Sequence, residues 1–151
     1  MEQKEIFRVA EVQLSYKPHF KAQDRPQISS SQQAYQVLVE HWNKDLINYI
    51  EQAKVILLNS NNRVLGIVNL SSGGRASTVM DTRILFTIAL KAAATSIILC
   101  HNHPSGNLRL SSEDIRITEK IKQGGKLLDI AVHDHLIISE NGYLSMVEGA
   151  Y

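Results

Sequence analysis

The chain has 151 residues, of which 44% are hydrophobic and 21% are charged, values typical of one soluble globular domain. Sixteen Lys and Arg oppose fifteen Asp and Glu, and the resulting formal net charge of +1 argues against a protein that coats nucleic acid. A single cysteine, Cys100, excludes an internal disulfide, and the apolar stretches are too short to cross a bilayer. Because the N-terminus lacks a secretory pattern, we expect a cytoplasmic protein with no membrane partner.

An alternation of apolar and polar side chains over residues 5–16 predicts a half-buried strand. Residues 17–28 carry two prolines among polar residues and predict a connecting loop. We therefore expect residues 1–27 to form a strand-and-loop extension packed on one domain of residues 28–151.

Three consecutive serines, residues 29–31, offer N-caps for a helix that continues to about Trp42. Two runs rich in Val, Ile and Leu, residues 49–59 and 63–70, flank a Ser-Asn-Asn turn. Such runs around a short turn predict a β-hairpin.

A second helix, capped by Asp81 or Thr82, is predicted to end near Ala94, because apolar residues recur there at helical spacing. The run of residues 96–100, which is apolar after Ser96, predicts a strand that is covered on both faces.

A third helix is predicted to begin at Ser111 and to end at Gly124-Gly125. Residues 127–139 then predict a last long strand, followed by a turn at Asn141-Gly142. This alternation of strands and helices predicts a layered α/β domain.

Two histidines in the pattern His101-x-His103 directly follow the buried strand, in a loop that contains Pro104 and Gly106. Eleven residues later, Asp114 falls in the first turn of the predicted third helix. Two neutral imidazoles and a carboxylate suit Zn²⁺, and three protein ligands leave a fourth position open, as in catalytic sites. The alternatives are a solvated histidine pair and an aspartate that serves only the helix N-terminus.

A hydrolytic zinc site also needs a general base, and Glu51 at the start of an apolar strand is the candidate. The alternative is a solvated charge where the chain enters the strand.

These residues together are recognisable. The pattern of Glu51, His101-x-His103, seven residues, Ser111, two residues and Asp114 resembles the JAMM motif of JAB/MPN metallohydrolases. The string from His101 to Gly106, His-Asn-His-Pro-Ser-Gly, resembles the RadC-like branch, as does Asp134-His135 further on. The resemblance covers residues 28–143.

The resemblance implies a three-layer α/β/α fold with a mixed sheet, a cytidine-deaminase-like architecture. It implies a zinc-dependent metalloprotease or isopeptidase-like hydrolase that acts on a polypeptide or isopeptide-type substrate. One Zn²⁺ per chain would be held by His101, His103 and Asp114. Glu51 would activate water and Ser111 would hydrogen-bond the oxyanion. Asp134 or His135 would orient one of the ligands.

Two other functions stay open: a binding module of DNA-repair machinery and an inactive JAB/MPN scaffold. Some RadC-like proteins carry a helix-hairpin-helix DNA-binding module, and nothing in residues 1–45 resembles one. A zinc deaminase is excluded because it needs more than one cysteine. The loop that contains Gly73-Gly74, Arg75 and Thr78 is expected beside the site, in contact with substrate.

Overall fold

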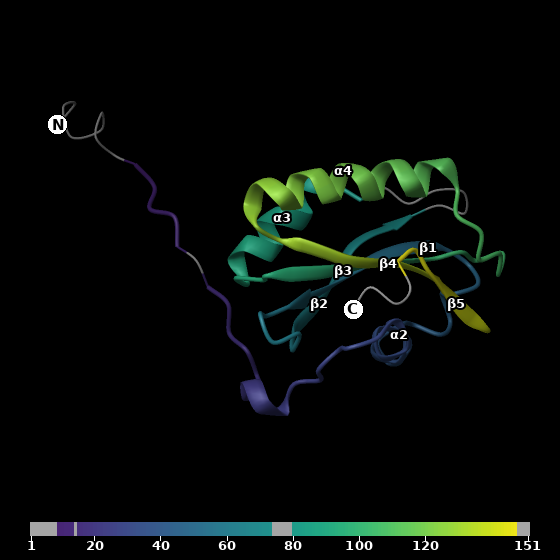
Figure 1. The fold of residues 1–151 in the computed structure, drawn as a ribbon, viewed down its shortest axis with the longest axis horizontal. Coiled ribbons are helices and arrows are strands. Elements are labelled where there is room, and N and C mark those ends of the chain that lie inside the picture. Colours follow the sequence, from purple (N-terminus) through teal and green to yellow (C-terminus); the bar gives the residue numbers. More distant parts are fainter. Residues whose placement is uncertain (1–8, 14, 74–79, 148–151) are drawn as a thin grey trace.

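A single β-sheet forms the centre of the fold (Figure 1). The computed structural model describes residues 9–13, 15–73 and 80–147. Within them, five strands pair in the order β2-β1-β3-β4-β5. They are β1 (Glu51–Leu58), β2 (Val64–Gly73), β3 (Ser96–Asn102), β4 (Ala131–Ser139) and β5 (Gly142–Ser145). Strands β3 and β4 run parallel and the other neighbours run antiparallel, so the sheet is mixed.

Helices cover both faces of this sheet. Figure 1 shows α3 (Thr82–Lys91) and α4 (Ser112–Leu128) on one face and α2 (Ser31–Glu40) on the other, preceded by the short 3-10 helix η1 (Ala22–Asp24). The predicted three-layer α/β/α fold with a mixed sheet is confirmed. No helix in the described part of the chain is both long and apolar enough to cross a membrane.

Two apolar clusters fill the space between the layers. Leu85 of α3 and Ile121 of α4 belong to the cluster on one face, and Leu38 of α2 joins Ile56 and Leu136 on the other. Because β1 and β3 lie between these clusters, every residue of both strands is buried. The strand predicted over 96–100 is thereby confirmed.

Local side-chain hydrogen bonds determine where the helices begin. Ser30, Asp81 and Ser111 are the N-caps of α2, α3 and α4, as predicted, and each accepts a main-chain N–H from the first turn. At the predicted hairpin between β1 and β2, the side chain of Asn59 accepts the N–H of Arg63 at 2.9 Å. The predicted helix starts and the hairpin are confirmed because their signals are local.

The predicted end of the third helix was wrong. Helix α4 continues through Gly124-Gly125 to Leu128, and the last long strand begins at Ala131 instead of residue 127. The turn between them falls at Asp129, which adopts a left-handed conformation with φ 56°.

Close packing explains why the two glycines stand inside a helix. A Cβ atom on Gly125 would overlap the carbonyl oxygen of Ile130, and one on Gly124 would lie 2.8 Å from Cε2 of Phe86. The missing side chains let α4 approach α3 and the start of β4. Packing, and not the end of the helix, requires glycine here.

The strand predicted over residues 5–16 is also wrong in its described part. Residues 9–13 form no strand, and the side chain of Val9 is 87% exposed. An alternating pattern becomes a strand only where a neighbour supplies main-chain partners, and none is provided for these residues. Further on, the hydroxyl of Tyr16 donates to the carbonyl oxygen of Leu65 in β2 and joins this segment to the sheet edge.

Parts of the predictions fall on residues 1–8 and 74–79, outside the described residues. These include the first part of the predicted strand and the loop residues Arg75 and Thr78. The division of the chain at residue 28 stays a prediction.

Candidate metal centre

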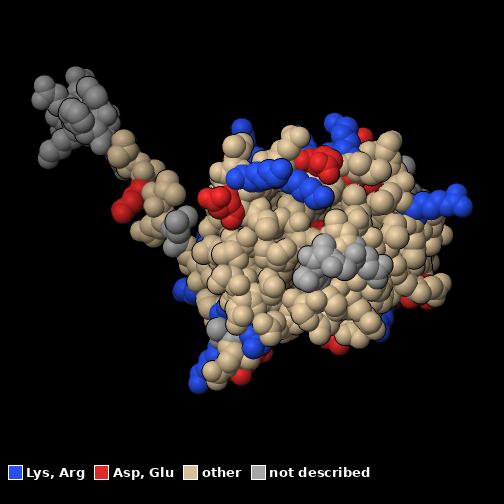
Figure 2. Space-filling view, in the orientation of Figure 1, with Lys and Arg blue, Asp and Glu red and all other residues tan. Residues whose placement is uncertain are grey.

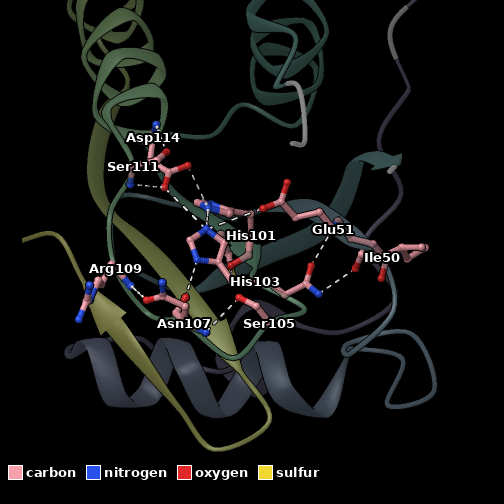
Figure 3. Close-up of polar contacts among 12 residues, drawn as sticks. Ile50, Glu51, His101, His103, Ser105, Asn107, Arg109, Ser111 and Asp114 are labelled. Atoms are coloured by element: carbon pink, nitrogen blue, oxygen red, sulfur yellow. Dashed lines mark hydrogen bonds and ion pairs between the residues drawn. The ribbon is translucent and has the colours of Figure 1, made fainter. Parts of the chain in front are cut away.

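Four predicted site residues meet where three elements come together (Figure 3). His101 lies near the carboxyl end of β3, His103 follows this strand, and Asp114 lies in the first turn of α4. Glu51 is the first residue of β1, which runs antiparallel to β3 with Ala53 opposite His101. The start of β1 therefore lies beside the end of β3, and the four side chains point toward one another.

The donor atoms of these side chains are close together. His101 Nε2 lies 2.9 Å from His103 Nε2 and 3.1 Å from Asp114 Oδ1. His103 Nε2 lies 3.7 Å from Asp114 Oδ2 and 3.8 Å from Glu51 Oε1, with the two carboxylates on opposite sides of the histidine pair. Because none of the four side chains is more than 15% exposed, the interpretation as a solvated histidine pair is wrong.

The four residues line one cavity of about 480 Å³. Ser111 also borders it, as do apolar side chains from α4 and from the segment before α3. The cavity places a substrate-sized space directly against the four donor groups. Its lining consists of Glu51, Met80, His101, His103, Pro104, Ser105, Asn107, Arg109, Leu110, Ser111, Glu113, Asp114 and Ile117.

His103 presents its Nε2 to this cavity. Its Nδ1 lies 2.6 Å from the carbonyl oxygen of Asn107, which can only accept a hydrogen bond. Nδ1 therefore carries a proton, and when the ring is neutral its lone pair is on Nε2. The Asn107 side chain accepts the N–H of Arg109 at 2.9 Å, and its own N–H donates to Ser105 Oγ at 3.3 Å, so the loop holds this carbonyl in place.

A longer series of hydrogen bonds fixes the tautomer of His101. The Thr118 hydroxyl donates to the carbonyl oxygen of Asp114 at 2.7 Å, so its oxygen accepts from His135 Nδ1, 2.5 Å away. Burial, and then the nearby His101, lower the pKa of His135 to about 3, so that ring is neutral and its Nε2 carries no proton. His101 Nδ1 therefore donates to His135 Nε2 at 2.7 Å, and in the neutral ring this tautomer leaves the lone pair on Nε2.

The resulting arrangement fits a metal cation. Two bare nitrogens and an adjacent carboxylate repel one another unless a positive charge lies among them. Two ligands of a tetrahedral Zn²⁺ would be about 3.3 Å apart, and the distances of 2.9, 3.1 and 3.7 Å among His101, His103 and Asp114 bracket this value. Glu51 adds a fourth group, because its ligand atom and those of the two histidines lie within 4.8 Å of one another.

Ser111 and Asp114 form a capping box at the start of α4. The Ser111 side chain accepts the N–H of Asp114 at 3.0 Å, and Asp114 Oδ2 accepts the N–H of Ser111 at 2.9 Å. Partial burial alone would raise the pKa of Asp114, but a protonated His101, which would donate to Asp114 and carry a positive charge, and the hydrogen bond from the main-chain N–H of Ser111 hold that pKa well below its ordinary value. Asp114 thus serves the helix N-terminus and also faces the histidines, and the Ser111 hydroxyl proton is left for another acceptor.

The two other predicted residues, Asp134 and His135, differ in their surroundings. His135 contacts His101 directly. The buried carboxylate of Asp134 accepts hydrogen bonds from the Ser145 hydroxyl at 2.5 Å and from the N–H of Met146 at 3.1 Å. These bonds tie β4 to the end of β5.

Two residues that orient the histidines, Thr118 and Asn107, were not predicted from the sequence. Thr118 follows Asp114 by four residues, so it lies on the same face of α4 one turn later, and that spacing was a usable signal. Asn107 acts through a main-chain carbonyl, and a side-chain pattern carries no signal for such a contact.

The chain belongs to a known family. Residues 28–151 match the RadC-like JAB domain. This match agrees with the resemblance that the motif residues carry.

Several bacterial relatives share this domain, and each is named only as a UPF0758 protein. The chain is 48% identical over 98 residues to one from Flavobacterium johnsoniae, an alignment that covers 65% of this chain and 43% of the relative. It is 44% identical over 98 residues to one from Alkaliphilus metalliredigens, covering 65% and 42%. One from Desulfitobacterium hafniense is 39% identical over 126 residues, covering 82% and 53%. The chain thus spans about half the length of the curated relatives it matches.

Proposed function

We propose that this RadC-like chain is a zinc-dependent hydrolase of peptide or isopeptide bonds. The observation that carries the proposal is the pair of Nε2 atoms of His101 and His103, 2.9 Å apart, that face a cavity with a carboxylate on either side. A site built only for structural zinc would be closed by four protein ligands, whereas this one opens on a cavity of about 480 Å³.

Three side chains would hold the ion: His101, His103 and Asp114. When bound, Zn²⁺ supplies Lewis-acid chemistry, which makes a water molecule more acidic and polarises a carbonyl group. We infer that His135 and Thr118 keep His101 in the tautomer that the ion needs, and that Asp134 holds β4 and hence His135 in place.

The remaining steps belong to the chain's own groups. Glu51, with its carboxylate at the cavity wall, is placed to take a proton from a water molecule and to pass it to the amide nitrogen as the C–N bond breaks. The products are a carboxylate and an amine. The Ser111 hydroxyl donates to the substrate's carbonyl oxygen while negative charge develops there, a contribution of about 3 kcal/mol.

Metal analysis tests the site. Wild-type protein, incubated with Zn²⁺ and dialysed, is expected to retain one Zn²⁺ per chain, and the His101→Ala and His103→Ala variants are expected to lose it. His133→Ala is the matched control, because this β4 histidine bonds Asn62 at 3.1 Å, away from the cavity. A wild type that retains no zinc would overturn the proposal.

A second experiment tests the reaction. A mixture of fluorogenic peptides and lysine-linked isopeptides is incubated with the zinc-loaded wild type and with Glu51→Gln. We expect Glu51→Gln to retain zinc and to lose at least about 100-fold in hydrolysis, because it cannot accept a proton. Hydrolysis that this substitution leaves unchanged would favour another base, and zinc binding without hydrolysis of any probe would favour the inactive scaffold.

Charge argues against DNA as the main partner. On the face seen in Figure 2, Lys and Arg are interspersed with Asp and Glu and form no continuous positive patch. This agrees with the net charge of +1. We propose a polypeptide as the partner and the cytosol as the location, where the buried free thiol of Cys100 would stay reduced.

A further inference from the structure

Asn102 is the residue between the two histidines, and its side chain lies on the opposite face of β3 from theirs. It is completely buried. Its Oδ1 accepts the N–H of Gln52 at 2.7 Å, and its Nδ2 donates to the carbonyl oxygens of Ile47 at 2.7 Å and Ile50 at 2.9 Å. One amide thus makes three hydrogen bonds to the main chain that leads into β1.

Two of these bonds hold the peptide groups on either side of Glu51. The Ile50 carbonyl belongs to the peptide group that enters Glu51, and the Gln52 N–H belongs to the one that leaves it. Fixing both peptide planes fixes the backbone dihedral angles of Glu51, and with them the direction of its Cα–Cβ bond. Figure 3 shows the Glu51 side chain next to Ile50 and pointing toward His103.

The sheet alone does not supply this restraint from the β3 side. The β1–β3 pairing begins at Ala53 opposite His101, so Glu51 and Gln52 precede it. The Asn102 side chain takes the place of the next main-chain bond of the ladder. Because Asn102 is covalently joined to both histidines, it links their positions directly to that of Glu51.

We propose that Asn102 is a positioning residue that sets where the Glu51 carboxylate lies relative to His101 and His103. The inference rests on the proposed function for its consequence, since Glu51 is there the group that handles the proton. A residue that only joined two strands would change the stability of the fold when replaced, but would leave the position of the Glu51 carboxylate unchanged.

The test compares Asn102→Ala and Asn102→Asp with Asn59→Ala. Asn59 is the matched control because its side chain also accepts main-chain N–H groups, from Asn61 at 3.0 Å and Arg63 at 2.9 Å, but at the far end of β1. Asn102→Asp keeps the shape and the acceptor but replaces the NH₂ donor by an oxygen. Each substitution is made in the wild type and in Glu51→Gln, and Zn²⁺ affinity is measured by competition with a chelating dye.

Glu51 is not one of the three proposed ligands, but its carboxylate lies 3.8 Å from His103 Nε2 and its negative charge favours a cation there. We therefore expect both Asn102 substitutions to weaken Zn²⁺ binding about tenfold in the wild type and to change it less than about twofold once Glu51 is already Gln. Asn59→Ala is expected to leave the affinity unchanged in both backgrounds. Equal losses of Zn²⁺ affinity in the two backgrounds, or an unchanged affinity in both when the wild type does bind Zn²⁺, would overturn the inference.

Crystal structures of the metal-free wild type and Asn102→Ala give a readout that needs no zinc. We expect the Glu51 carboxylate to move away from His103 while the β1–β3 pairing from Ala53 onward is retained. A carboxylate that stays in place would refute the positioning role. If the wild type binds no zinc but Glu51 moves in the variant, the proposed function fails and the positioning role stands.

Discussion

At the scale of single residues, the tautomer of His101 depends on the direction in which one hydroxyl group donates its proton. Thr118 donates that proton to the carbonyl oxygen of Asp114, which obliges its oxygen to accept from His135. Each subsequent ring nitrogen then has one possible role. The Thr118 hydroxyl, which contacts His101 only through His135, therefore determines whether the neutral His101 ring has its lone pair on Nε2.

Thr118→Val is predicted to weaken Zn²⁺ binding about tenfold or more, measured by dye competition. Without the hydroxyl, His135 Nδ1 has no hydrogen-bond acceptor, so the tautomer with the proton on His135 Nε2 is favoured. This nitrogen then donates to His101 Nδ1, which forces the His101 proton onto its own Nε2. Two-bond ¹H–¹⁵N correlation spectra of the metal-free variant should report this tautomer. Thr87→Val is the control, because Thr87 makes the same type of bond, 2.8 Å to the carbonyl oxygen of Arg83, within α3. Wild-type affinity in Thr118→Val would contradict the prediction.

The site could be predicted in part, because its residues carry local signals. The His101-x-His103 spacing and the first-turn place of Asp114 can be read along the chain, and the family motif adds Glu51. The tautomers could not be predicted. They depend on contacts among segments that are distant in sequence, such as His135 in β4 with Thr118 in α4.

At the scale of elements, α4 connects the site to the core. Its first turn carries Asp114, and its last turns pack Gly124 and Gly125 against neighbours. The predicted end failed because glycine is compatible both with a helix end and with close packing inside a helix. The helix starts succeeded because N-caps such as Ser30 and Asp81 act within one turn. The N-terminal strand failed because its alternation had no pairing partner in the described chain.

Gly125→Ala is predicted to lower the free energy of unfolding by about 1–3 kcal/mol, measured by urea denaturation. The added methyl group would meet the carbonyl oxygen of Ile130, and main chain cannot turn aside as a side chain can. Gly66→Ala is the matched control, because a Cβ atom there has nothing within 4 Å. Equal stability of the two variants would show that α4 is free to shift, and would remove packing as the reason for the glycine pair.

At the scale of the whole molecule, folding itself creates the site. Glu51 begins one strand, His101 lies near the end of another, and Asp114 lies in the first turn of a helix on one face of the sheet. The donor groups therefore meet only in the native state. The unfolded chain lacks this arrangement. A cation that binds the native state alone must stabilise it in proportion to the logarithm of its concentration.

Zn²⁺ at 100 times its dissociation constant is therefore predicted to add about 2.7 kcal/mol of stability and to raise the melting temperature by about 5–10 °C. Excess chelator should reverse the shift. Mg²⁺ should not reproduce it, because imidazole ligands disfavour this hard cation. His103→Ala, which removes one donor but leaves both core clusters intact, should melt at one temperature with or without Zn²⁺. A shift that persists in His103→Ala would place the stabilising ion elsewhere on the protein, and no shift in the wild type would mean that the converging donors hold protons instead of a metal.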